Sequence, residues 1–452
     1  MRLRQLFSAA CLILAACASV PEVPPSSSAK PVILGSKGPL TDKQSKALIA
    51  KLGPGEQDLL QRHMAVEEAV AETPLIAGNK TRVLRDGPAT FAAMFEVIRA
   101  ARHNINLEYF IFEDVKSGDQ SLGDLLVEKR HQGVQINILY DSYGSLGTPQ
   151  TFFDRLLKEG IQVVEFNPLN PLDAKKLSLA PNDRDHRKIL VADGAHAIVG
   201  GVNLSTTYMS GPSNPLKAAE GPQLPWRDTD LQIDGPAVAQ LQHLFIDHWG
   251  AQKGPDLDSS DFFPVIPAKG REVIRILGST PDHDVPRFYV TLLSAIRTAQ
   301  KRIWLNTAYF VPTHQEMEDL EKAARRGVEV KLVVPESSDS DLSIDVQHSR
   351  YEDLLEAGVQ IYETHGEILH SKSAVIDGVW SVIGSSNFDH RSVLFNDEVD
   401  AVVLGTDTAQ ELEGLFTRDF IGAHQIDLAS WKQRPLAEKM REMFARVTQP
   451  ML

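Results

Sequence analysis

A histidine and a lysine that occur together twice are the residues of this chain best suited to chemistry. The two copies share one spacing and read His186-x-Lys188-x4-Asp193 and His370-x-Lys372-x4-Asp377. One such pair is common, but two copies at the same spacing are hard to obtain by chance. Apolar residues follow each lysine at the density of a strand, and side chains two apart on a strand face the same side. We therefore expect the histidine and the lysine of each copy to project together.

The aspartate that ends each motif has a different expected role. Asp193 and Asp377 are each followed by a glycine, which is a turn signal. Although both complete the predicted catalytic motif, we expect them to shape the turn and bond to neighbouring backbone rather than to act as acids.

Two imidazoles and two ammonium groups that face each other would suit a phosphodiester. The ammonium groups would neutralise the non-bridging oxygens, where charge builds in the transition state. One imidazole could attack phosphorus and become a phosphohistidine, while the other protonates the departing alcohol and then deprotonates the incoming one. This double displacement needs no metal, and the other histidines lack the clustered spacing of metal ligands. No cofactor is expected.

Supporting residues are expected after each motif. A segment with glycine and asparagine follows both copies and ends at Asn203 in the first and at Asn387 in the second. Farther along, Asp228 and Glu398 lie at matching places and could each fix the tautomer of a histidine and stabilise its charged form. Their alternative interpretation is that of ordinary surface or turn carboxylates.

The segments around the motifs form an internal repeat that must position them. Each half has a helix before a strand, a second helix that ends in glycine before a strand, a Leu-Leu segment before the motif, and a closing helix. The segments are 95–102, 105–112, 125–133, 134–140, 156–163 and 238–249 in the first half, and 292–299, 303–311, 320–327, 328–334, 354–361 and 409–420 in the second. This alternation predicts α/β layers with mostly parallel strands. Two such units predict a pseudo-twofold, bilobal body with its site at the seam.

Composition predicts the domain boundaries. Residues 41–74 are typical of a helical preface, residues 75–253 and 271–452 of the two repeated domains, and the Gly- and Pro-containing residues 254–270 of the linker between them. Residues 210–225 have no counterpart in the second half. They are either a loop near the site or a tolerated surface insertion.

The N-terminus has the layout of a secretory signal peptide, with a positive start and a short apolar segment. Its sequence Leu14-Ala15-Ala16-Cys17 resembles a bacterial lipoprotein lipobox. This resemblance implies a signal peptide at residues 1–16, acyl chains on Cys17, and a Pro- and Ser-rich tether at residues 17–40. The alternative is an ordinary signal peptide that happens to hold a cysteine. We expect a lipoprotein of the bacterial cell envelope that is anchored in the membrane and faces the periplasm.

The acidic balance of the chain bears on its partners. The 452 residues carry a formal net charge of −14, and the loss of Arg2 and Arg4 with the signal peptide would make it −16. Such a chain suits nucleic acid poorly, because phosphates would repel it unless a local basic groove intervened. The only cysteines are Cys11 and Cys17, so the mature body has no disulfide and no cysteine metal site. No segment past residue 20 is long and apolar enough to span a bilayer.

On these motifs the chain resembles the phospholipase D superfamily, and within it the bacterial cardiolipin synthases. The superfamily signature is the doubled motif with its glycine and asparagine. The closer resemblance rests on residues 106–112, 184–188, 199–203, 309–312, 338–341 and 384–392, on Asn396, Glu398, Trp431 and Arg434, and on residues 450–452. It implies two phospholipase D-like domains, each an α-β-α sandwich, related by a pseudo-twofold axis with the active site at their seam.

The resemblance also implies a two-step transfer between phospholipid substrates. One phosphatidylglycerol would lose its head-group alcohol and leave a phosphatidyl-histidine. The hydroxyl of a second phosphatidylglycerol would then take the phosphatidyl group, giving cardiolipin and glycerol. Each histidine would be supported from the opposite half, His186 by Glu398 and His370 by Asp228. We expect His186 to be the nucleophile and His370 the acid/base, although pseudo-symmetry leaves the reverse assignment open.

Three other functions would use the same motif. A phospholipase D-type hydrolase would release phosphatidic acid with water as the acceptor. A nuclease would need a basic, aromatic groove, against which the acidic composition argues, so no nucleic acid is expected. A non-catalytic lipid-binding protein would be expected to have degenerate motifs, whereas both are complete. Many cardiolipin synthases begin with membrane-spanning helices, and the lipobox-like start is a departure that leaves access to the cytoplasmic leaflet open.

Overall fold

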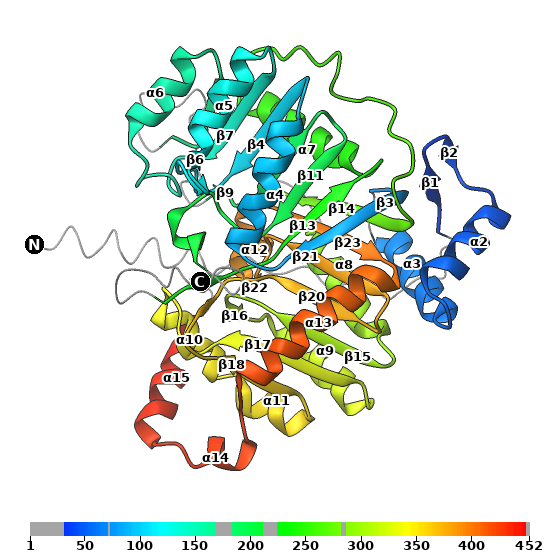
Figure 1. Cartoon of the computed structure of the whole chain (residues 1–452). Helices are drawn as coiled ribbons and strands as arrows, with labels where there is room; N and C mark the ends of the chain where they lie inside the picture. Colours follow the sequence, from blue (N-terminus) through cyan, green and yellow to red (C-terminus); the bar gives the residue numbers. More distant parts are fainter. Residues whose placement is uncertain (1–30, 71–72, 169–182, 211–223, 282–285, 449–452) are drawn as a thin grey trace, which may run out of the picture.

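Two halves of the chain repeat one succession of strands and helices (Figure 1). The computed structural model describes residues 31–70, 73–168, 183–210, 224–281 and 286–448. The first half comprises β3 (Leu75–Leu84), α4 (Gly87–Ala100), β4 (Asn104–Tyr109), β5 (Lys116–Ser117), β6 (Gln120–Ser121), α5 (Leu122–His131), β7 (Gln135–Asp141), α6 (Gln150–Lys158), β8 (Gln162–Phe166), β9 (Arg184–Asp185), β10 (Lys188–Ala192), β11 (His196–Gly200), the 3-10 helix η2 (Thr206–Met209), β12 (Trp226–Arg227), β13 (Asp230–Asp234) and α7 (Val238–Ala251).

The second half repeats this order and adds a C-terminal tail. It comprises β14 (Glu272–Ser279), α8 (Arg287–Thr298), β15 (Arg302–Asn306), β16 (Phe310–Val311), α9 (His314–Arg325), β17 (Glu329–Pro335), α10 (Asp341–His348), α11 (Tyr351–Ala357), β18 (Gln360–Thr364), β19 (Ile368–Leu369), β20 (Ser373–Ile376), β21 (Trp380–Gly384), β22 (Phe388–Asp389), α12 (His390–Leu394), β23 (Asn396–Leu404) and α13 (Thr406–Gly422). The tail holds β24 (His424–Gln425), α14 (Leu428–Lys432) and α15 (Leu436–Thr448). Every segment of the predicted repeat overlaps an observed helix or strand.

The strand order is the same in both halves. It runs β8-β7-β4-β10-β11-β13-β3 in the first half and β18-β17-β15-β20-β21-β23-β14 in the second. Only the first two pairings of each order are parallel, so the expectation of mostly parallel strands was wrong. In each half a tight turn joins the motif strand to the next strand, β10 to β11 and β20 to β21, and consecutive strands joined in this way pair antiparallel.

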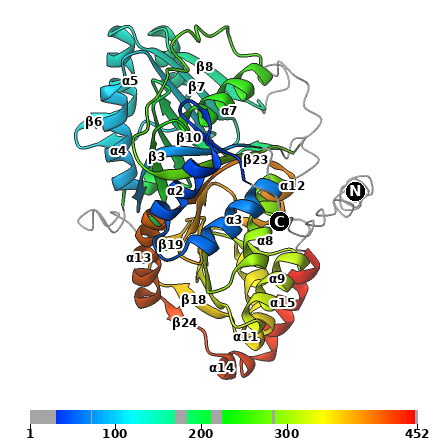
Figure 2. The ribbon, with the colours of Figure 1, turned by 90° about the vertical axis from the view of Figure 1, so that its right-hand side faces the viewer.

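The two halves meet along β3 and β14, which pair antiparallel. Apolar side chains alternate along the motif strand: Leu190 packs under α4 and α5, whereas Ile189 and Val191 face α7 and α13. Each sheet thus lies between helical layers (Figures 1 and 2). The cluster around Ile189 and Val191 also contains Ile274 and Val403 of the second half, so the halves share a core.

The N-terminal part departs from one predicted boundary. Residues 33–39, expected within the tether, form the hairpin β1 (Ile33–Gly35) and β2 (Gly38–Pro39), and β1 pairs parallel with β3. Ile33 is buried there, which explains why these residues belong to the folded body. The predicted preface contains α2 (Asp42–Leu52) and α3 (Gln57–Val70). Among the described residues, no helix combines the length and the apolar character that crossing a membrane would need.

Candidate active site

Two short parallel strand pairs carry each histidine across to the opposite half. His186 follows β9, which pairs with the start of β23 in the second half. His370 follows β19, which pairs in the same way with β12 in the first half. The backbone N–H of His186 donates to the carbonyl of Asp397 at 2.9 Å, and that of His370 donates to the carbonyl of Arg227 at 2.7 Å. The two motifs therefore meet at the seam, each beside residues of the other half.

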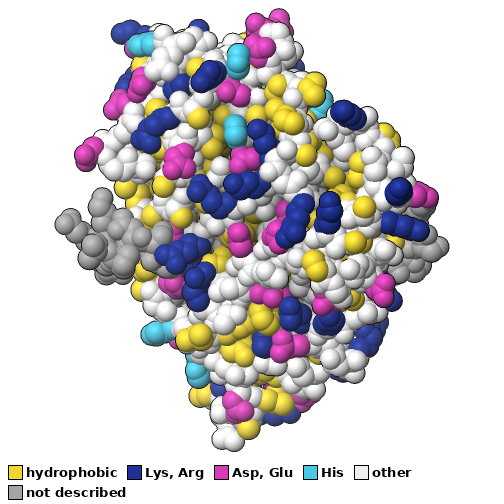
Figure 3. Space-filling model, turned by 45° about the vertical axis from the view of Figure 1, so that its right-hand side comes forward, with side chains coloured by type: hydrophobic (Ala, Val, Ile, Leu, Met, Phe, Trp, Pro, Cys, Tyr) yellow, Lys and Arg dark blue, Asp and Glu magenta, His cyan; other side chains and the backbone are white. Residues whose placement is uncertain are grey.

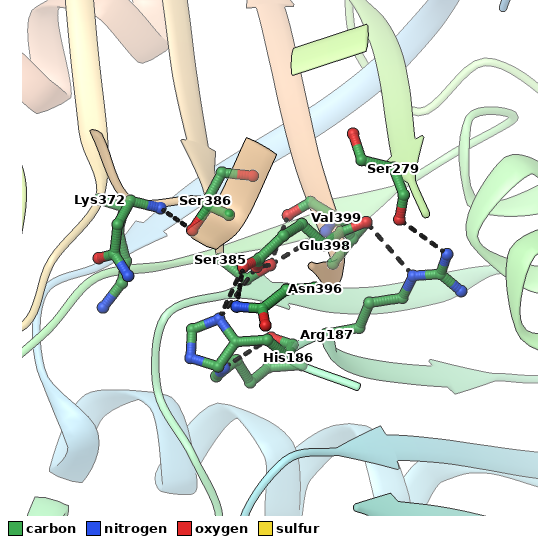
Figure 4. A network of polar contacts seen from close by, with 12 residues as sticks. His186, Arg187, Ser279, Lys372, Ser385, Ser386, Asn396, Glu398 and Val399 are labelled. Carbon is green, nitrogen blue, oxygen red and sulfur yellow. Dashed lines mark hydrogen bonds and ion pairs between the residues drawn. The ribbon is translucent and has the colours of Figure 1, made fainter. Parts of the chain in front are cut away.

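Glu398 of β23 is the partner of His186 (Figure 4). Its Oε2 and Oε1 lie 2.9 and 3.1 Å from Nδ1 of His186. Glu398 is held in turn by the hydroxyl of Ser385, which donates to Oε2, and by Nδ2 of Asn396, which donates to Oε1 at 3.0 Å. An Nδ1–H that donates to this buried carboxylate leaves Nε2 with a free lone pair, as a nucleophile or a base requires.

His370 lies in a more crowded, aromatic environment. Oδ2 of Asp228 is 2.6 Å from its Nδ1, and the hydroxyl of Tyr208 is 3.1 Å from the same nitrogen. The rings of Tyr208, Trp226 and Tyr309 surround the imidazole, with centroids 5.9, 5.1 and 6.4 Å from its own. Both histidine–carboxylate pairs are those that the family resemblance implied. The aromatic residues were not foreseen, because they come from three segments that have no common spacing.

Each lysine lies beside the histidine of its own motif. Nζ of Lys188 donates to the carbonyl of His186 at 2.6 Å and lies 5.5 Å from the centroid of the Phe110 ring. Nζ of Lys372 donates to the carbonyl of His370 and lies 2.8 Å from its Nδ1. The histidines themselves precede β10 and β20 rather than lie on them, because the chain there turns toward the opposite half.

Burial governs the ionisation of these groups. It lowers the pKa of His186 to about 4, and it lowers the pKa of His370 well below its usual value, where the charge of Lys372 adds to the effect. Burial also lowers the pKa of Lys188 to about 7 and that of Lys372 to about 8. Both imidazoles are therefore neutral at pH 7. A phosphodiester anion between the lysines would raise all four pKa values.

The two supporting carboxylates differ in their surroundings. Burial raises the pKa of Asp228 to about 6. Burial acts in the same direction on Glu398, but the contacts with His186, Lys188 and Ser385 outweigh it and lower the pKa of Glu398. Where Ser385 donates to Glu398, the first half has Gly201, and a Cβ at that position would overlap Oδ1 of Asp228. The shorter carboxylate thus packs directly against backbone.

Asp193 and Asp377 lie at the other end of the motif strands from the histidines. Both have a positive φ, 51° and 55°, in the turns after β10 and β20. Their carboxylates accept hydrogen bonds from consecutive backbone N–H groups, those of Arg102, His103 and Asn104 for Asp193 and those of Gln300, Lys301 and Arg302 for Asp377. Each aspartate therefore anchors the start of a neighbouring central strand, in agreement with the turn and backbone role expected for it.

Asn203 and Asn387 are both buried, with different contacts. Oδ1 of Asn203 accepts from the backbone N–H of Ile111 at 3.2 Å, and its Nδ2 donates to the hydroxyl of Tyr208 at 3.3 Å. The backbone N–H of Asn387 donates to Oγ of Ser392 at 3.0 Å, and its Oδ1 has no hydrogen-bond partner within the described part of the chain. Asn203 thus positions a tyrosine that borders the second histidine.

Arg187, inside the first motif, ties the site to the core behind it (Figure 4). Its Nε donates to the carbonyl of Glu398 at 3.2 Å, and one terminal nitrogen donates to the carbonyl of Ser279 at 3.2 Å. The other terminal nitrogen lies 3.3 Å from Oε1 of Glu108, which also lies 2.7 Å from Nδ1 of His248. These contacts hold the backbone of Glu398 in place.

Glu108, Asp185 and His248 offer ligand atoms within 4.8 Å of one another, a grouping that sequence spacing did not reveal. His248 lies on α7 and is buried. The guanidinium of Arg187 already supplies a positive charge to Glu108 at 3.3 Å. The group forms an ion-pair network behind the site.

Known proteins share this architecture. The family model described as "Cardiolipin synthase, PLD-like domain" matches residues 94–214 and 292–420, more than half of the chain, and each match contains one motif. The chain belongs to this family. A cardiolipin synthase of Geobacillus thermodenitrificans is 34% identical over 403 residues, which cover 89% of this chain and 77% of that protein. A probable cardiolipin synthase of Bacillus subtilis is 30% identical over 397 residues, covering 87% and 76%.

A solved structure supports the fold of this member of the cardiolipin synthase family. The phosphatidylserine synthase of Haemophilus influenzae superimposes with a TM-score of 0.62, over 87% of this chain and 98% of that one, at 13% sequence identity. At this identity the likeness speaks for the fold alone. The predicted fold class, two phospholipase D-like α/β units with their site at the seam, is confirmed.

Proposed function

We propose that this chain is a phosphatidyltransferase that makes cardiolipin from phospholipids such as two molecules of phosphatidylglycerol. The observation that carries the proposal is a pair of histidines, His186 partly buried and His370 buried, each bonded through Nδ1 to a carboxylate of the opposite half and each beside a lysine. The relatives named as cardiolipin synthases support the class of substrate.

The reaction would proceed in two displacements at phosphorus. Nε2 of His186 attacks the phosphorus of the first lipid, a P–N bond forms, and the P–O bond to the head-group glycerol breaks. His370, protonated on Nε2 once the bound phosphodiester anion has raised its pKa, gives that proton to the glycerol oxygen. It then takes the proton of the second lipid's hydroxyl, whose oxygen attacks phosphorus and breaks the P–N bond. Lys188 and Lys372 would stabilise the charge on the non-bridging oxygens.

The enclosure of the site favours a lipid acceptor over water. The side chains of His186 and His370 are only 12% and 8% exposed. A site that excludes bulk water protects a phosphatidyl-histidine from hydrolysis. The net charge of −14 argues against nucleic acid as the substrate. On the face shown in Figure 3, basic and acidic side chains are interspersed.

Purified protein mixed with phosphatidylglycerol in detergent micelles tests the proposal. We expect cardiolipin and glycerol by mass spectrometry, and their loss in His186→Ala and His370→Ala. Phosphatidic acid as the main product would favour the hydrolase instead. If folded wild-type protein makes neither cardiolipin nor phosphatidic acid, phosphatidyl transfer is refuted.

We also propose that Cys17 carries acyl chains and anchors the enzyme in the bacterial envelope, facing the periplasm. The lipobox-like residues before Cys17 support this; they lie outside the described part of the chain. Radiolabelled palmitate should be incorporated by the wild type and not by Cys17→Ser. Labelling that survives the substitution would contradict the anchor.

A further inference from the structure

The C-terminal helix α15 turns an apolar face away from the protein. Leu436, Met440, Met443 and Phe444 follow one another at steps of four, three and one, which places them on one side of a helix. Their side chains are 72, 57, 62 and 77% exposed. A surface helix of a globular protein normally buries such a stripe against the core. Here the arrangement is reversed.

The opposite side of α15 fastens the helix to its neighbours. Ala445 is 3% exposed and packs in a cluster with Val346 of α10 and Val311 of β16. Ion pairs flank this contact and join Arg441 to Asp345, Arg446 to Asp353, and Arg434 to Glu442. Because charged pairs hold α15 in this orientation, the exposure of its apolar stripe is built into the fold.

The exposed stripe lies close to the chemistry. Figure 1 shows α15 beside α10, and Tyr309 packs against the cluster that contains Ala445. The ring of Tyr309 lies edge-on to the ring of His370, with the centroids 6.4 Å apart. One side of α15 thus leads through a single aromatic side chain to the site, while its other side faces solvent.

The charge of this segment differs from that of the whole chain. Residues 428–448 contain five basic residues and two acidic ones, a net of +3, whereas the chain as a whole carries −14. Four of the basic residues are paired with carboxylates: Lys432 with Glu356, Arg434 with Glu442, Arg441 with Asp345 and Arg446 with Asp353. A helix with an exposed apolar face of this kind is suited to the interface of a phospholipid bilayer.

We propose that the apolar face of α15 docks onto the surface of an anionic phospholipid bilayer and holds the active-site seam at the membrane. The face would enter the boundary between head groups and acyl chains. The choice of a lipid surface as the occupant rests on the proposed function, since a phospholipid substrate must leave such a surface to reach His370.

Flotation with phosphatidylglycerol-rich vesicles tests the docking face, with phosphatidylcholine vesicles for comparison. All arms use the full chain carrying Cys17→Ser, so that no acyl anchor contributes. We expect Met440→Glu combined with Phe444→Glu to reduce vesicle binding roughly tenfold or more, because two apolar side chains no longer enter the interface. The matched control is Val265→Glu, a residue 89% exposed in the segment between the halves, which should bind like the parent protein. Unchanged binding by the double variant would overturn the proposal.

Activity on dispersed short-chain phosphatidylglycerol separates this proposal from the proposed function. The double variant should keep its cardiolipin synthesis there, since that substrate needs no bilayer, and its melting temperature should match the parent. If the parent protein makes no cardiolipin from this substrate, the proposed function is refuted. The flotation experiment would still test membrane docking on its own. The parent protein could instead form a dimer that the double substitution dissociates while vesicle binding stays unchanged. That result would show that the apolar face of α15 contacts a second copy of the chain, and it would overturn membrane docking.

Discussion

Gly201 and Ser385 stand at equivalent places in the two halves and meet the two supporting carboxylates in different ways. Ser385 donates to Glu398, whereas the missing side chain of Gly201 leaves room for Asp228. Gly201 and Ser385 thus break the pseudo-symmetry of the repeat. This difference also makes the role of each carboxylate separately testable.

Gly201→Ala should reduce kcat/KM by about a hundredfold, because the added Cβ would overlap Oδ1 of Asp228 and displace the partner of His370. Steady-state cardiolipin synthesis in micelles measures the effect. Gly414→Ala is the matched control, because a Cβ there meets no other atom within 4 Å. Full activity of Gly201→Ala would show that Asp228 need not approach so closely.

The pH profile follows from the ionisation of the site. Asp228, with a pKa of about 6, must be ionised to hold His370, so kcat/KM should fall as pH drops below about 6. Lys188 and Lys372, with pKa values of about 7 and 8, must be charged to meet the phosphodiester, so kcat/KM should fall again as pH rises through that range. Rates from pH 4.5 to 9.5 on a short-chain substrate test this. A flat profile between about pH 7 and 9 would contradict the role of the lysines.

At the scale of elements, short strands and turns place the motifs. The pairs β9–β23 and β12–β19 carry each histidine to the other half, and the turns after β10 and β20 fix the central strands. Asp377 shows how a motif residue can act far from the reaction: it binds three backbone N–H groups and Nε2 of the buried His63 on α3.

Asp377→Ala should lower the free energy of unfolding by about 2 to 3 kcal/mol, because several hydrogen bonds to a charged group are lost. Burial acts to raise the pKa of Asp377, but the bonds from His63 and the backbone lower it on balance. The contribution of Asp377 to the free energy of unfolding is therefore present above its unfolded pKa near 3.9. It is lost as the pH falls through the lower pKa of the folded state. Urea unfolding at pH 7 measures the loss, with the exposed Asp256→Ala as control. Equal stability of both variants would exclude this anchoring role.

At the scale of the whole molecule, the shared core makes the halves interdependent. Ile189 and Val199 of the first half pack in one cluster with Ile274 and Val403 of the second. Neither half could expose this cluster without loss of stability, and neither contains both members of a histidine–carboxylate pair. The site therefore requires the complete two-unit body.

Equilibrium unfolding should consequently show one transition, with tryptophan fluorescence and circular dichroism coinciding. Ile189→Ala should shift that whole transition by about 2 to 5 kcal/mol, because it removes buried atoms from the shared cluster. Leu157→Ala, at a residue 49% exposed, should shift it little. Two separate transitions, only one of them sensitive to Ile189, would show that the halves fold independently.

Much of the fold and the reactive groups could be predicted from the sequence. Spacing within one strand is a local property, so the doubled motif, the repeat and the turn at Asp193 were visible in the order of residues. The matching places of Asp228 and Glu398 in the repeat marked them as candidate partners. Their pairing with the histidine of the opposite half came from the family resemblance, since their distance along the chain from the histidines carries no geometric signal. The expectation of mostly parallel strands failed because local periodicity does not record which distant strand a segment pairs with.

The sequence by itself determined the chemistry that His186, Lys188, His370 and Lys372 can perform and the duplication of the unit that bears them. Only the tertiary structure decided that β9 and β19 cross the seam, that Tyr208 and Arg187 support the site, and that α15 exposes its apolar face. Those features depend on contacts between residues far apart in the chain. Packing of the whole body selects such contacts, and no local pattern encodes them.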